Sequence, residues 1–282
     1  MLTALDEPYA PQAREILKLL RAKAPDSEIQ ALILSIHNDA ITQGVTDPLV
    51  PSTDAYVTSI CYLGSKSLSH VLSCIERCKE RLLAIGPESE EARRQIIESV
   101  MQYWADKPGI GVNIVDKLLN YTILTPMSVL EWALVTKLDR GNILTSPHVY
   151  ELISATIFKV SNRIRQIVIA RNQQDLSKEQ AAVLGETLER EKRQMAGLFA
   201  LIEDSCMAVG AGSADQMIES EDLSSHADAM LRAWGRRWLR VFRRKNAVEQ
   251  AWIAETLADR PKLVHGNGTA GDASMEGDEA EL

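Results

Sequence analysis

Ten prolines divide the sequence, and their positions constrain the fold more than any other feature. Proline has no amide hydrogen and a fixed φ, so it can open a helix but interrupts a hydrogen-bonded helix interior. No proline lies between Pro147 and Pro261, and this interval can therefore hold much longer helices than the part before it. We expect all ten prolines to lie between helical segments: Pro8, Pro11, Pro25, Pro48, Pro51, Pro87, Pro108, Pro126, Pro147 and Pro261.

Between the prolines, apolar residues recur every three or four positions, which is the spacing of one buried helix face. Short connections predict antiparallel neighbours, so the expected fold is all-α, with stacked antiparallel helical hairpins like a HEAT or armadillo-type solenoid. Thr125-Pro126 and Ser146-Pro147 are typical of an N-cap followed by the first helical residue, and Ser177 and Gln180 have the spacing of a capping box. The expected helices of the first half are Gln12–Ala24, Ser27–Gln43, Thr53–Leu63, Leu68–Ile85, Glu90–Asp106, Ile110–Leu124 and Met127–Leu138.

The apolar pattern of the second half of the sequence predicts longer helices than those of the first half. One pattern runs from about His148 to Asn172, and a second follows the polar turn Gln173–Ser177, so we expect a long, protruding helix pair over about residues 148–210. A polar connector follows it. A final helix pair is expected over Ala227–Lys245 and Ala247–Leu257.

The charge is concentrated at the C-terminal end of the sequence. The net charge is −8, and residues 266–282 contribute −5 with no lysine or arginine, which leaves −3 for residues 1–265. A nearly balanced body does not predict a nucleic-acid surface from bulk charge. We expect one helical repeat domain over residues 1–258 and a disordered acidic tail over residues 259–282.

Motifs of catalysis are absent from the sequence. It contains no glycine-rich phosphate loop, no nucleophile elbow and no His-Glu-x-x-His pair, so we expect no enzyme, no catalytic residue and no cofactor. Cys61, Cys74, Cys78 and Cys206 lack the spacing of a metal site, and we expect buried thiols in a reducing compartment and no bound metal. No signal peptide is visible at the first residues and no apolar run approaches the span of a bilayer, so we expect a soluble intracellular protein.

One segment suggests a charged interaction surface. The expected helix around Arg232–Lys245 carries arginines on one stripe, at 100° per residue, and aromatic residues on another. The stripe can contact phosphates or an acidic partner, or it can be an ordinary solvated face that packs near the many glutamates of the chain. The apolar stripe consists of Trp234, Trp238, Val241 and Phe242. The candidate RNA or partner contacts are Arg236, Arg240, Arg243 and Arg244.

Several segments, in order, carry a family resemblance. Gly64–Ile75 (GSKSLSHVLSCI) contains a Ser-Lys-Ser-x-Ser-His motif, and Gln95–Trp104 (QIIESVMQYW) ends in a tryptophan. Pro108 precedes Ile114–Leu119 (IVDKLL), and Leu130–Leu134 (LEWAL) follows. Together, over about residues 10–258, these segments resemble the C-terminal part of the large subunit of the nuclear mRNA cap-binding complex, most closely its fungal members.

The resemblance implies a fold like the middle domain of initiation factor 4G and a non-enzymatic scaffold. Its implied partners are a small subunit with an RNA-recognition motif, capped RNA through that subunit, and RNA-processing and export factors. It also implies a nuclear location with shuttling to the cytoplasm, and roles in splicing, export and nonsense-mediated decay. The residues alone leave open a general HEAT-type protein adaptor, or an RNA-binding protein that uses the Arg232–Lys245 helix.

Overall fold

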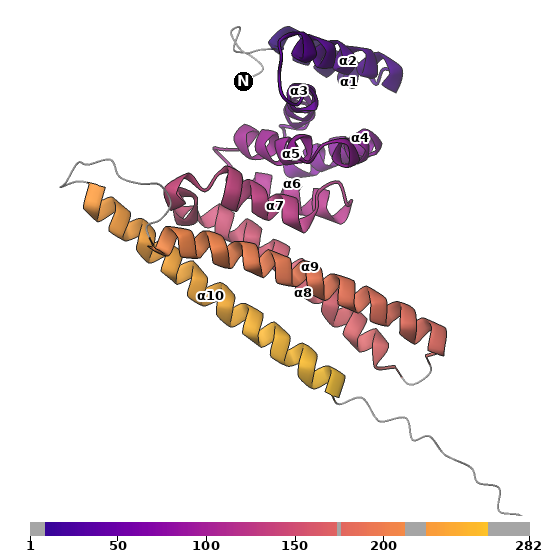
Figure 1. The fold of residues 1–282 in the computed structure, drawn as a ribbon. Coiled ribbons are helices and arrows are strands. Elements are labelled where there is room, and N and C mark those ends of the chain that lie inside the picture. The colour runs from indigo at the N-terminus through magenta and orange to yellow at the C-terminus, as the bar shows by residue number, and fades with distance from the viewer. Residues whose placement is uncertain (1–8, 174–175, 212–223, 259–282) are drawn as a thin grey trace, which may run out of the picture.

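The computed structural model describes residues 9–173, 176–211 and 224–258, and throughout these ranges the regular structure is helical (Figure 1). The prediction of an all-α fold is confirmed. The expected connector after residue 211 and the expected acidic tail lie outside the described residues. Within them, the apolar side chains of the stack and of the long helices form one continuous core.

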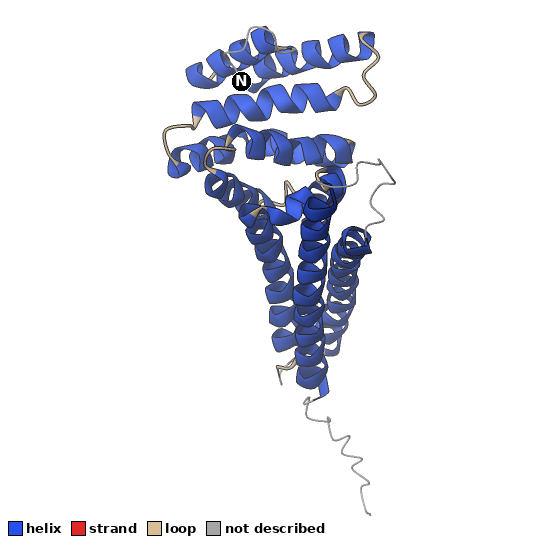
Figure 2. Cartoon of the chain, turned by 90° about the vertical axis from the view of Figure 1, so that its left-hand side faces the viewer, coloured by secondary structure: helices blue, strands red, loops and turns tan. Residues whose placement is uncertain are grey.

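The first half of the chain is a stack of short helices. Most helices pack on the one two positions ahead, α1 on α3, α3 on α5, α4 on α6, α5 on α7 and α6 on α8, whereas α2 packs on α1 and α3. This is the packing order of a helical solenoid, and Figure 2 shows the successive layers. The helices are α1 (Ala10–Ala22), α2 (Asp26–Thr42), α3 (Leu49–Leu63), α4 (Leu68–Glu88), α5 (Glu90–Tyr103), α6 (Pro108–Asn120) and α7 (Pro126–Glu131).

Local signals set most helix starts. The Thr125 side chain accepts a hydrogen bond from the backbone of Ser128, which bonds back in a capping box. Ser177 and Gln180 form a second box at 3.0 and 3.2 Å, as predicted. Ser146 precedes Pro147 at the start of a helix, but its side chain makes no capping bond. Contrary to the expectation that all prolines lie between helices, Pro87 lies inside the last turn of α4.

The segment after α7 is not the single helix that was expected to reach Leu138. A π-helical turn spans Trp132–Thr136, where the Lys137 amide donates to the Trp132 carbonyl at 2.9 Å. A 3₁₀ segment follows over Asp139–Thr145. The indole of Trp132 is buried and donates to a Glu98 carboxylate oxygen at 2.8 Å, so a contact with α5 holds the wider turn in place.

The second half is a bundle of three long helices: α8 (Pro147–Arg171), α9 (Lys178–Ala211) and α10 (Ser224–Ala258). The expected helix pair is α8 and α9, and α10 runs along both of them away from the stack (Figure 2). The expectation of two final helices is wrong, because α10 continues through residues 245–247. Neither glycine nor proline occurs there, so nothing in the local sequence stops the helix.

Two contacts fix the register of α10 on α8. Arg165 bonds to Glu249, and the Asn172 side-chain amide donates to the Thr256 carbonyl at 2.7 Å. Both pairs are 84 positions apart, so the two helices run parallel in one constant register. Within each helix, the two contact residues are seven positions apart. Seven residues make about two helical turns, so both contacts lie on the same face of each helix.

Gly235 marks the closest approach of α10 to α9. A β-carbon at this position would lie 2.9 Å from the Cys206 carbonyl oxygen and 2.9 Å from the Gly210 nitrogen. Both atoms belong to the backbone of α9, which cannot rotate away as a flexible side chain could. The hydrogen atom of Gly235 therefore sets the spacing of the two helices.

We predict that Gly235→Ala destabilises the protein, because the added methyl group must push α9 and α10 apart. The expected loss is about 1–3 kcal/mol in the free energy of unfolding, measured by urea denaturation followed by circular dichroism. Gly185→Ala is the matched control on α9, where the nearest atoms belong to the Arg171 side chain at 3.9 Å. The control is expected to stabilise by up to about 1 kcal/mol, and equal effects would contradict the prediction.

Candidate interaction surfaces

The four arginines singled out from the sequence all lie on α10 and all are exposed. They do not act as one set. Arg243 forms an ion pair with Glu203 of α9, and Arg236 donates to the Gly210 carbonyl at 3.4 Å, near the C-terminal end of α9. These two side chains tie α10 to its neighbour.

Arg240 and Arg244 point to solvent, and neither has a carboxylate partner within 4.0 Å in the described part of the chain. Arg232, half-buried, is also without one, whereas Arg237 lies over the Trp234 ring at 5.3 Å. The name "arginine face" is used below for Arg232, Arg236, Arg240 and Arg244. On this face the positive charge is compensated only in part.

The apolar stripe of α10 differs from its prediction at one position. Trp238 and Phe242 are buried and pack against Tyr150 of α8, with ring centroids 5.2 and 6.0 Å away. Val241 is exposed, so it does not belong to the stripe. The helix α10 packs against both α8 and α9. Residues four or seven positions apart share a helix face, and the spacing of the buried residues leaves Val241 on the side that faces solvent.

The α8–α10 interface contains a buried charge that the sequence did not indicate. Glu249 is buried and accepts two hydrogen bonds from Arg165, at 3.0 and 2.9 Å. The Arg165 guanidinium also lies 5.0 Å from the centre of the Trp252 ring. Burial lowers the pKa of nearby Lys245, and the Glu249 charge opposes that shift. A bidentate pair of this kind fixes position as well as charge.

An open groove of about 1240 Å³ lies where the stack meets the bundle. Residues of α5, α6, α7, α8 and α9 line it, and the exposed ring of Phe158 lies among them. Its cations are matched by acids: Lys159 contacts Asp116 at 2.9 Å, and Arg163 contacts buried Glu191 at 3.3 Å. The groove is therefore close to neutral, unlike the arginine face. Its residues come from five helices, so no single sequence motif revealed it.

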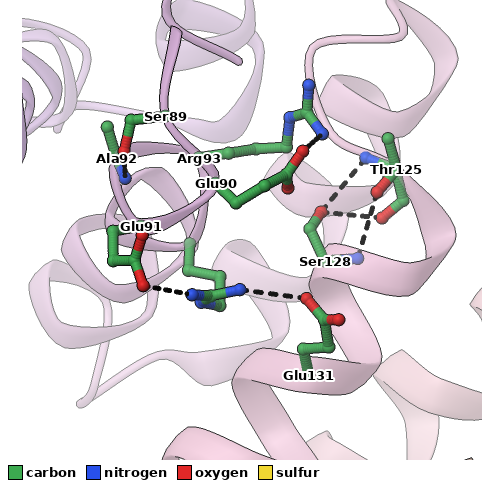
Figure 3. A network of polar contacts seen from close by, with 9 residues as sticks. Ser89, Glu90, Glu91, Ala92, Arg93, Thr125, Ser128 and Glu131 are labelled. Atoms are coloured by element: carbon green, nitrogen blue, oxygen red, sulfur yellow. Dashed lines mark hydrogen bonds and ion pairs between the residues drawn. The ribbon is translucent and has the colours of Figure 1, made fainter. Parts of the chain in front are cut away.

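One wall of this groove is a polar network between α5 and α7 (Figure 3). Arg94 bridges the two helices, with Glu91 at 2.9 Å and Glu131 at 3.0 Å. Arg93 pairs with Glu90 beside the Thr125 capping box. The wall is thus held by ion pairs that span helices as well as by packing.

The segment that carried the family resemblance has a structural role. Gly64 ends α3, and a β-carbon there would collide with the backbone of Val71, so only glycine fits. The Ser67 side chain accepts from the His70 amide at 3.2 Å and caps α4. Asp116, in another segment of the resemblance, pairs with Lys159 of α8. These motifs therefore maintain the contacts between helices.

The four cysteines are buried and unpaired. Burial raises the pKa of Cys61 and of Cys206 to about 12, and it also raises the pKa of Cys74 and Cys78. At neutral pH such thiols are almost fully protonated and poor nucleophiles or ligands. Among the described residues, no group of three or more histidine, cysteine or acidic side chains is placed to hold a metal ion.

A stack of helical hairpins that continues into a long bundle defines an all-α, solenoid-type helical protein. More narrowly, the family model described as MIF4G like matches residues 3–251, and the chain belongs to that family. The fold and the family expected from the sequence motifs are thereby confirmed.

The chain is similar to several nuclear cap-binding proteins. It is 27% identical over 171 residues to nuclear cap-binding protein subunit 1 of Schizosaccharomyces pombe, which covers 60% of this chain and 20% of that protein. Subunit 1-A of Xenopus laevis is 26% identical over 153 residues, or 52% of this chain and 19% of the relative. Subunit 1 of Homo sapiens is 24% identical over 152 residues, with the same two shares. The aligned part is thus about a fifth of each relative.

The long helices are amphipathic rather than uniformly apolar. Across the part of the chain that the structure describes, no helix combines the length and the hydropathy needed to cross a bilayer.

We predict that Glu249→Gln weakens the bundle, because the Arg165 guanidinium loses a charged bidentate acceptor. The expected loss is about 1–3 kcal/mol in the free energy of unfolding, from urea titrations. Glu203→Gln is the control, since its partner Arg243 is exposed and an exposed pair is worth less than about 1 kcal/mol. A loss at Glu249 no larger than at Glu203 would show that the buried pair adds nothing.

We also predict that the folded protein reacts slowly with a thiol reagent at pH 8. With a pKa of about 12, roughly one in ten thousand of the Cys61 and Cys206 thiols is a thiolate at that pH, and burial also raises the pKa of Cys74 and Cys78. Absorbance with a disulfide reagent should report fewer than one fast thiol per chain before unfolding and all four in 6 M guanidinium. Rapid labelling of the native chain would contradict the burial of these side chains.

Proposed function

We propose that this chain is a non-enzymatic scaffold of a nuclear cap-binding complex, where it holds a small subunit with an RNA-recognition motif and so supports binding of the 7-methylguanosine cap. The observation that carries the proposal is the family match over residues 3–251, joined to relatives named nuclear cap-binding protein subunit 1. A subunit implies a further subunit, and a helical stack offers long surfaces for one. Location in the nucleus and roles in splicing, export and nonsense-mediated decay belong to the same proposal.

The physical character of the chain supports a scaffold. The segments that carry the family resemblance include the turn at Gly64 and Asp116, which pairs with Lys159, and these contacts serve packing between helices. In the groove, the exposed aromatic ring of Phe158 is surrounded by equal numbers of acidic and basic side chains. Such a surface suits a protein ligand better than a phosphate group. We place the groove first among the surfaces for a protein partner.

A second candidate function is direct contact with RNA through the arginine face. The observation that favours it is the exposure of Arg240 and Arg244 without carboxylate partners. Such contacts would be to phosphates, would weaken steeply with salt and would not depend on base sequence. A general helical adaptor without any RNA link is the remaining alternative.

The test is co-elution of this chain with the small cap-binding subunit from the same source, followed by retention on a cap-analogue resin. Formation of a complex that is retained and then released by free cap analogue is the expected outcome. Because the chain matches about a fifth of its relatives, the same experiment is repeated with the full-length large subunit of a relative as a positive control. Failure of the chain beside success of the control would overturn the proposal for this chain.

Phe158→Ser is the variant that tests the groove, since it removes the exposed ring without emptying a buried position. We expect it to weaken binding of the small subunit by about tenfold or more, as for an aromatic anchor at an interface. Val183→Ser, an exposed apolar residue on α9, is the matched control and should leave affinity unchanged. Equal affinities for both variants would exclude the groove as the binding surface.

A further inference from the structure

The arginine face lies in a segment of α10 with a dense positive charge. Between Arg232 and Lys245 the sequence has six arginines, one lysine and no acidic residue. Some cations elsewhere, such as exposed Lys18 and half-buried Lys192, have a glutamate one helical turn away, at 3.3 and 3.0 Å. Arg240 and Arg244 have none, although the chain as a whole carries −8. A positive surface attracts acidic side chains that can reach it.

One run of acidic side chains lies further along the same chain. Residues 266–282 contain five acidic side chains and no lysine or arginine, and seven residues separate them from the end of α10 at Ala258. This acidic segment consists of Asp272, Glu276, Asp278, Glu279 and Glu281.

The distances allow the two to meet. Along the axis of α10, Arg244 lies about 21 Å from Ala258 and Arg232 about 39 Å from it, at 1.5 Å per residue. The 14 residues from Ala258 to Asp272 span at most about 46–50 Å when extended. The acidic segment can therefore turn back and reach every position of the arginine face.

We propose that residues 266–282 bind to the arginine face of the same molecule and neutralise it. A single exposed ion pair contributes only about 0.2–1 kcal/mol, so the association depends on several pairs and on the tether. A short tether gives an effective concentration on the order of millimolar, which makes weak contacts populated. The bound segment would compete with any other polyanion for Arg240 and Arg244. This inference stands independently of the cap-complex role.

The experiment places a nitroxide spin label on Ser274→Cys in the full chain. The four native cysteines are buried, so the label goes to the new thiol. The readout is paramagnetic broadening of backbone amide resonances, first in 0.02 M and then in 0.5 M NaCl, where the screening length falls from about 20 Å to about 4 Å. We expect broadening centred on residues 236–247 that is at least about threefold weaker at high salt.

The variant Arg240→Gln with Arg244→Gln should abolish that broadening, because it removes the unpaired charges and leaves the packing of α10 intact. The matched control is Arg14→Gln with Lys23→Gln, two exposed cations of the α1 region, which should change nothing. Absence of broadening on α10 at low salt, or broadening that survives the α10 double variant, would overturn the proposal.

A second readout distinguishes the segment from RNA as the occupant. Binding of a fluorescein-labelled uridine RNA, about 20 nucleotides long, is measured for the full chain and for a chain whose five acids are changed to Asn or Gln. We expect the neutralised chain to bind at least about tenfold more tightly at low salt. Equal affinities and equal salt slopes would mean that the acidic segment does not occupy the face, and would overturn the proposal.

Discussion

Burial of the apolar side of α9 is the constraint on which the second half of the molecule depends. This helix contacts α7 and the π-helical turn of the stack, and it also packs against α8 and α10. A long helix gains little from propensity alone, so its stability comes from tertiary contacts along its length. The stack and the bundle consequently share one hydrophobic core. The buried side chains of α9 include Leu188, Met195, Leu198, Ile202, Cys206 and Val209.

Features encoded within a few residues were predictable from the sequence, and features set by distant contacts were not. The capping boxes at Thr125 and Ser177 are local, and both appear as predicted. The π-helical turn at Trp132 depends on Glu98, 34 residues earlier, and no window around Trp132 contains that information. The unbroken course of α10 was not predicted, and the contacts that continue past residues 245–247 join it to α8, 84 positions earlier in the sequence.

The same distinction applies to the candidate site. Helical spacing correctly placed Arg236, Arg240, Arg243 and Arg244 on the exposed part of one helix. It could not separate the two that bond to α9 from the two that face solvent, because Glu203 lies 40 residues from Arg243. The groove near Phe158 is harder to predict from the sequence than the arginines are, because residues of five helices line it. Whether an arginine of α10 forms an ion pair or faces solvent depends on the side chains that the neighbouring helix α9 places beside it.

The constant offset of 84 between α8 and α10 has a consequence for how the lengths of these helices can change during evolution. An insertion of one residue between Arg165 and Asn172 would rotate one contact by about 100° relative to the other, and the same holds between Glu249 and Thr256. Only matched insertions of about seven residues in both helices would preserve both contacts, because an unmatched insertion of that length moves Asn172 about 10 Å along the axis from Thr256. Connections between the helices carry no such restriction, so length differences among homologues should concentrate there.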